Sequence, residues 1–250
     1  MIRCGMARLR HACLILVFLL ASLHGGNVFA DYIDSEQLTL YPTDDALSMV
    51  SDPVDPGVVQ TAMHYLYLGA VHVLIGWDHL AFVFCLTLLA SGLSLIGLIT
   101  AFTLGHSLSL GLAHFGLIQL PVAPVEAIIA LSIVFMAREA WLCRVPGSVG
   151  AAGSARSRPL ITAFFGLIHG LGFASVLGDL GVSSSQRALA LVFFNAGVEV
   201  GQVAFVLAVV VLGLVVRKVS LQQWLLPGLT AGIGGMGVFW TLERVLPGSS

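Results

Sequence analysis

The segment Val71–Ala90, VHVLIGWDHLAFVFCLTLLA, is apolar enough to cross a membrane as a helix, which takes about 20 apolar residues. Its first half nevertheless contains His72, Asp78 and His79. Ionisable side chains are unfavourable inside a membrane, and those that occur there usually face a cavity or the interior of a bundle. The segment therefore predicts a membrane helix that contributes to a functional site.

The composition of the whole chain also indicates a membrane protein. Of its 250 residues, 58% are hydrophobic and only 10% are charged, and the mean hydropathy is +0.98. These values are typical of a polytopic membrane protein and exclude an ordinary soluble domain. We expect the lipid bilayer to be a partner, and we expect no nucleic acid.

Residues 1–30 have the parts of a signal peptide. Three arginines precede the apolar run Cys13–Leu23, which is too short to span a membrane, and small residues follow up to Ala30. We expect cleavage after Ala30, and an uncleaved first membrane anchor is the alternative. Residues 31–57 hold seven of the 13 acidic residues and no Lys or Arg. We expect this short acidic segment to be periplasmic in a bacterial cell.

Residues 58–250 predict an all-α fold, a bundle of six transmembrane helices with a cytoplasmic loop at about residues 143–159. The six apolar windows are Val58–Ala90, Leu95–Leu117, Val125–Leu142, Leu160–Leu177, Leu189–Val216 and Trp224–Val245. In this arrangement six Lys or Arg residues fall on one side of the membrane and two on the other. Positive residues concentrate on the cytoplasmic side. We therefore predict a multi-pass protein of the bacterial inner membrane with both mature termini in the periplasm.

Polar and ionisable side chains recur at membrane depth in these windows. Since a helix rises about 1.5 Å per residue, we expect several of them to reach similar depths on different helices. The candidate metal ligands are His72, Asp78, His79, His106, His169 and Glu199. The candidates for residues around the ligands are Ser107, Glu126, Asn195 and Gln202. Imidazole and carboxylate ligands without thiolates suit nickel, cobalt, zinc or iron, and a divalent cation would make their burial together tolerable.

Simpler interpretations stand beside these. A single histidine in a membrane helix can serve as an interhelical hydrogen-bond partner, and Asn195 and Gln202 can hold helices together in the same way. Glu126 can simply favour the N-terminus of a helix. Three ionisable residues within one short run, His72 to His79, are harder to explain in these terms.

Gly76 separates His72 from Asp78 and His79. On a regular helix His72 and His79 would share one face, whereas Asp78 would point about 100° away. Because glycine weakens a helix, Gly76 predicts a local break that turns Asp78 and His79 toward one cavity. Ligand histidines must be neutral, so we expect metal binding to weaken as the pH falls toward about 6.5.

These residues carry a resemblance to a known family. The sequence resembles the HupE/UreJ membrane proteins over about Tyr67–Gln202. The similar segments are HVLIGWDH (72–79), TAFTLGHS (100–107), VEAIIALSI (125–133), AFFGLIHG (163–170) and FNAGVEVGQ (194–202). Members of that family accompany hydrogenase or urease genes and act as nickel, sometimes cobalt, permeases. The resemblance thus implies a secondary transporter for a divalent metal ion, with a link to metalloenzyme maturation and no tightly bound cofactor.

The match to the family's motifs is uneven. In the first motif His72, Gly76, Asp78 and His79 fit, while Val73 stands in place of a proline. In the second, His169 and Gly170 fit, while Phe173 and Val176 stand at the later His and Glu positions. The chain thus resembles a divergent branch of the family.

Two other functions use the same residues. A membrane-embedded zinc hydrolase could hold Zn²⁺ with three His and Asp78 and use Ser107 beside His106. A metal sensor or assembly partner would bind the ion without transport. The sequence leaves the oligomeric state open.

Overall fold

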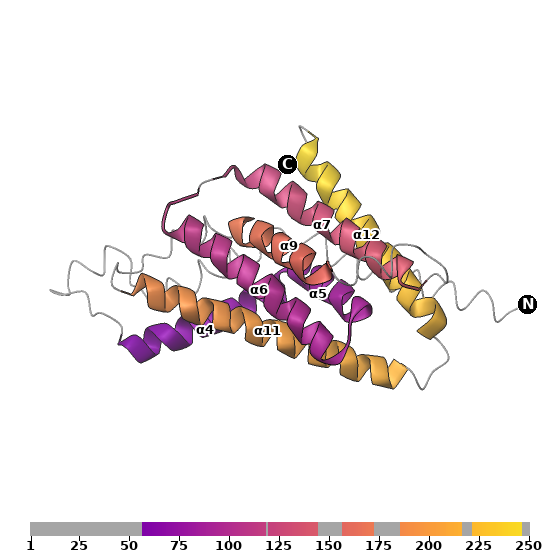
Figure 1. The fold of residues 1–250 in the computed structure, drawn as a ribbon, viewed down its shortest axis with the longest axis horizontal. Helices are drawn as coiled ribbons and strands as arrows, with labels where there is room; N and C mark the ends of the chain where they lie inside the picture. The colour runs from indigo at the N-terminus through magenta and orange to yellow at the C-terminus, as the bar shows by residue number, and fades with distance from the viewer. Residues whose placement is uncertain (1–56, 119, 145–156, 173–185, 217–221, 247–250) are drawn as a thin grey trace, which may run out of the picture.

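The computed structural model describes residues 57–118, 120–144, 157–172, 186–216 and 222–246. Helices but no strands occur in this part of the chain, which confirms the predicted all-α fold. The helices are α4 (Val58–Ile75), α5 (Trp77–Leu89), α6 (Gly92–His114), α7 (Val122–Leu142), α9 (Arg158–Gly172), α11 (Arg187–Val216) and α12 (Gln222–Val245) (Figure 1). The predicted signal peptide, the acidic segment up to residue 56 and most of the predicted loop at 143–159 lie outside the described residues.

Each of the six predicted windows overlaps a helix, and the first contains two, α4 and α5. Among the described residues, three helical segments are long and apolar enough to cross a membrane: Val58–Ile75, Gly92–His114 and Arg187–Leu214. The shorter helix α5 is also apolar. These segments indicate a membrane protein, and the number of six spans and their orientation stay predictions.

The helices pack in pairs that are not neighbours in sequence: α4 against α11, α6 against α9, and α7 against α12 (Figure 1). Glycines bring the backbones of the first two pairs into contact. A Cβ atom on Gly69 would collide with the Phe194 carbonyl, and one on Gly166 would collide with the Phe102 carbonyl. Small residues at such crossings replace side-chain packing by close backbone contact, as is common between membrane helices.

Within the described residues, two buried apolar clusters occupy the interior. One includes Phe82 of α5 and Phe102 of α6, and the other includes Leu68 of α4 and Phe194 of α11. The rings of four histidines contact these clusters: His72 contacts Phe194, and His79, His106 and His169 contact Phe102. The pairing of the helices therefore places the histidines in the interior of the bundle.

Candidate metal site

The predicted break at Gly76 is present. Helix α4 ends one residue before it and α5 begins one residue after it, and Gly76 itself is extended, with φ −68° and ψ 99°. Its N–H donates to the His72 carbonyl at 3.0 Å, and its own carbonyl accepts from the Leu80 N–H at 3.0 Å. A Cβ atom on Gly76 would lie 2.8 Å from the His72 carbonyl oxygen, 3.0 Å from His79 Nδ1 and 3.1 Å from Asp78 Oδ1. The absence of a side chain thus leaves room for the groups on both sides of the break.

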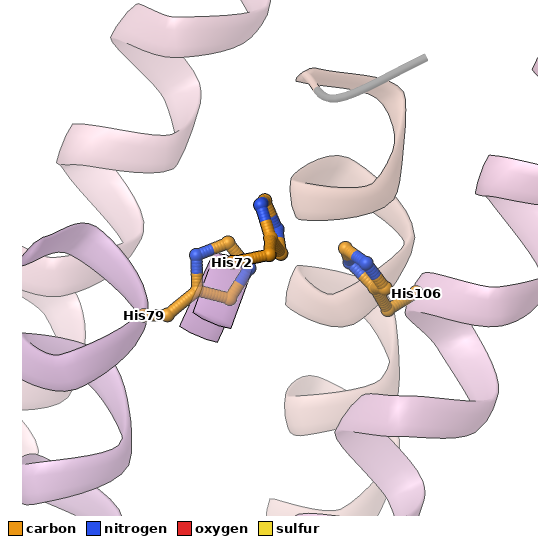
Figure 2. A group of neighbouring side chains, drawn as sticks. All are labelled: His72, His79 and His106. Carbon is orange, nitrogen blue, oxygen red and sulfur yellow. The ribbon is translucent and has the colours of Figure 1, made fainter. Parts of the chain in front are cut away.

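The break brings together histidines from three helices. One ring nitrogen each of His72 (α4), His79 (α5) and His106 (α6) lies within 4.8 Å of the other two, and Figure 2 shows the three rings turned toward one another. The side chains are 7%, 3% and 0% exposed, respectively. Two residues seven apart on a straight helix are separated by about 10 Å along its axis, whereas the ring centroids of His72 and His79 are 4.6 Å apart.

A fourth histidine, His169 of α9, lies beside this group. Its ring centroid is 5.2 Å from that of His79, and its side chain is 1% exposed. The rings of Phe82 and Phe102 flank it at 5.2 and 5.0 Å. Thus α4, α5, α6 and α9 each contribute one imidazole to this group.

Two of the rings have one nitrogen held by an acceptor. The Nδ1 atom of His79 lies 3.1 Å from Asp78 Oδ1, and His169 Nδ1 lies 2.8 Å from the Phe165 carbonyl oxygen. With Nδ1–H donated to these oxygens, each neutral ring keeps its lone pair on Nε2. Metal-binding histidines typically show this arrangement, because the partner of the other ring nitrogen fixes the tautomer and the ring orientation.

Four nitrogen atoms in the group are buried without a hydrogen-bond partner among the described residues. They are Nε2 of His79, both ring nitrogens of His106, and Nε2 of His169. A buried polar atom that lacks a partner costs about 1–3 kcal/mol. Their number at one place indicates a missing ligand, and neutral imidazole nitrogens suit divalent nickel, cobalt, copper or zinc.

The structure does not bring Glu199 to the histidines. Its side chain is exposed on α11. The neighbouring Gly197 and Gly201 approach the backbone of α4, and they define the face of α11 that packs inward. Glu199 lies two residues from each of them, so helical geometry turns it to the opposite side. The carboxylate that contacts these rings within the described part of the chain is that of Asp78, whose side chain is 34% exposed.

Two of the other candidates have partners that orient them away from a ligand role. Glu126 of α7 forms an ion pair with Arg244 of α12, with 2.9 Å between Oε2 and Nε. The hydroxyl of Ser107 donates to the Thr103 carbonyl of its own helix at 2.6 Å. The partner Arg244 was not predicted, because nothing in the sequence relates the ends of α7 and α12.

The two amide candidates differ from each other. The side-chain nitrogen of Asn195 donates to the Leu191 carbonyl within α11 at 2.8 Å. The Gln202 side chain is 0% exposed, and its Oε1 accepts a hydrogen bond from the Thr103 hydroxyl of α6 at 2.9 Å. Gln202 therefore joins two helices, as the simpler interpretation of the sequence expected.

The aromatic residues around the histidines were not predicted as part of the site. Phe82 lies three residues after His79, and Phe102 lies four residues before His106, so each shares a helix face with its histidine. Both side chains are 0% exposed. This spacing was the available signal, but apolar residues are so frequent in these helices that it did not single out the two phenylalanines.

Comparison with known families supports the resemblance noted in the sequence. The HupE / UreJ protein family is matched by residues 50–244. The matched range includes all four histidines, Asp78 and Gly76. No curated protein and no solved structure is similar enough to count as a match.

Proposed function

The chain belongs to the HupE/UreJ family, and we propose that it is a membrane permease for a divalent transition-metal ion, nickel or cobalt. The observation that carries this proposal is the group of buried ring nitrogens contributed by separate helices, which lie within 4.8 Å of one another for His72, His79 and His106. A site made by several helices can change its ligand distances when the helices move, as transport of the ion requires.

The four histidines and Asp78 have different roles in this proposal. His72, His79 and His106 bind the ion, and His169 adds a ligand or receives the ion from His79. Asp78 orients His79 through the contact at 3.1 Å and supplies a negative charge near the cation. Charge matters here because a divalent cation among neutral ligands in a low-dielectric interior is poorly stabilised.

The zinc hydrolase is the second candidate, since three histidines with an open fourth position also occur in catalytic zinc sites. The Ser107 hydroxyl donates its hydrogen to the Thr103 carbonyl rather than to a ring nitrogen, so Ser107 is not activated by a histidine. The hydrolase would therefore depend on a zinc-bound water. Hydrolysis of lipid or amide substrates by purified protein supplemented with zinc would favour this function over transport.

Uptake into proteoliposomes tests the permease directly. Purified protein should accumulate radioactive nickel or cobalt above the level of protein-free liposomes. His106→Ala should reduce the uptake rate by about tenfold or more. Loss of a residue that only hydrogen-bonds to a metal ligand already lowers affinity or activity by about 10–100-fold, and loss of the ligand itself should weaken the site further.

His114→Ala is the matched control. This residue lies on the same helix, eight positions after His106, and is not among the three histidines that meet within 4.8 Å. Its loss should leave uptake near the parental rate. Equal uptake by the His106→Ala, His79→Ala and parental proteins, all inserted normally, would exclude this metal site. Selective uptake of zinc or iron would keep the site and change the metal.

A further inference from the structure

Thr103 and Gln202 form a buried polar contact between α6 and α11. The side chains are 7% and 0% exposed, and the Thr103 hydroxyl lies 2.9 Å from Gln202 Oε1. The Nε2 atom of Gln202 is buried and has no hydrogen-bond partner among the described residues. Since an unpaired buried amide is unfavourable, such a group indicates a polar species bound beside it.

This contact lies next to the histidines. Thr103 is three residues before His106 on α6, so the two share a face and are separated by about 4.5 Å along the axis. Thr103 is on the side of His106 toward Gly92, where α6 begins. On α11, Gly201 approaches Ala70 and Val73 of α4, which places Gln202 at the level of the last turn of α4.

A group of aromatic residues lies beside this contact, since Phe102 is next to Thr103 in the sequence. The rings of Phe82 and Phe102 have centroids 4.9 Å apart, and Phe82 and Phe165 have centroids 5.9 Å apart. Phe82 and Phe102 belong to a cluster that continues through Leu86 toward the end of α5. Phenyl rings cannot replace the water molecules around a divalent ion. A hydroxyl and an amide, in contrast, can form hydrogen bonds with these water molecules.

We infer that Thr103 and Gln202 form a second, hydrated station for the transported ion, on the side of the histidines where α5 ends and α6 begins. Water molecules of the ion donate to Gln202 Oε1 and Thr103 Oγ1, and a further water accepts from Gln202 Nε2. The ion moves from the imidazoles to this station, where it is held through its water molecules and is not directly coordinated by the protein. The inference rests on the proposed function and adds to it a step in which release is separate from binding.

The experiment compares binding and transport in the same variants. Gln202→Leu and Thr103→Val remove the polar groups, and Thr103→Ser keeps the hydroxyl. Thr61→Val is the matched control, because Thr61 also donates to a buried glutamine, Gln186, at 2.6 Å. Radioactive nickel ion is the probe, used for equilibrium binding to the purified protein and for the initial rate of uptake into proteoliposomes.

We expect Gln202→Leu and Thr103→Val to lower the uptake rate by about tenfold. The dissociation constant for nickel should stay within about twofold of the parental value, because the histidines are intact. Thr103→Ser and Thr61→Val should keep both properties. If Gln202→Leu fails to insert, the comparison of Thr103→Val with Thr103→Ser decides.

Parental uptake rates in Gln202→Leu and Thr103→Val would overturn the second station and leave the permease intact. Binding that weakens in step with uptake would overturn it as well, because the pair would then belong to the histidine site. An equal loss in Thr61→Val would assign the effect to helix packing and have the same consequence. Parental protein that takes up no more nickel than protein-free liposomes do would overturn the proposed function together with the station.

Discussion

Gly76→Ala is the smallest change that tests how the break builds the metal site. Alanine can adopt φ −68° and ψ 99°, the observed backbone angles at Gly76, so the substitution introduces no backbone strain. Its effect comes from one added methyl group. That methyl group would meet the His72 carbonyl, the His79 ring and the Asp78 carboxylate.

The required displacements can be worked out from the distances. An ordinary Cβ contact begins at 3.4 Å, whereas the three distances are 2.8, 3.0 and 3.1 Å. The shortfalls are therefore 0.6 Å (3.4 − 2.8) at His72, 0.4 Å (3.4 − 3.0) at His79 and 0.3 Å (3.4 − 3.1) at Asp78. Binding groups have to be held within about 0.5 Å of their productive positions. Shifts of this size at a ligand and at its partner should weaken nickel binding by about 10–100-fold, as changes in outer partners of metal ligands do.

Equilibrium dialysis of the purified protein with radioactive nickel measures this effect, and a thermal melt of the same samples reports on folding. Gly97→Ala is the control, because Gly97 lies within α6 and a Cβ there would have no atom within 4 Å. It should bind like the parental protein and melt at the same temperature or slightly higher, since alanine favours a helix over glycine by up to about 1 kcal/mol. Parental affinity in a folded Gly76→Ala protein would refute the role of Gly76 in shaping the site.

The other predictions concern charge, the orientation of α11 and topology. Asp78→Asn keeps an oxygen that can accept from His79 but removes the negative charge, and we expect nickel uptake to fall by about tenfold or more. Glu199→Gln should take up nickel at the parental rate, because its side chain is exposed away from the histidines; a loss as large as that of Asp78→Asn would contradict this assignment. A reporter fused after Arg158 should behave as cytoplasmic and one fused at Ser250 as periplasmic, and the reverse pattern would reject the predicted orientation.

The histidines could be predicted from the sequence because of the regular rise of a helix. Once the windows were placed, the positions of His106 and His169 within them gave their depths, and the structure places both beside His79. The break at Gly76 could also be predicted, since glycine between polar residues at membrane depth is a local signal. Both predictions depend only on the position of residues along their own helix. A single sequence contains this information without any knowledge of how the helices pack.

Predictions that depended on which face of a helix packs inward were less successful. Glu199 was grouped with the histidines by depth, and depth says nothing about rotation around the helix axis. The spacing of Gly197 and Gly201 was a usable signal, because small residues four apart mark a packed face and leave the residue between them on the other side. The glycines of α12 show the limit of that signal: a Cβ on Gly228 or Gly232 would have no atom within 4 Å.

The partners of the polar residues depend on which helices pair, and sequence order does not give this. Because α4 pairs with α11 and α6 with α9, the three histidines His72, His106 and His169 belong to two separate glycine-packed units, and His79 of α5 contacts rings in both. The backbone contacts within each unit allow little change of distance, because a carbonyl already occupies the place of a missing Cβ. A displacement between the units would instead change the distances from His72 to His106 and from His79 to both. The distance between His72 and His106 is thus set by the packing of one helix pair on the other, whereas the 4.6 Å between the rings of His72 and His79 depends on the break at Gly76.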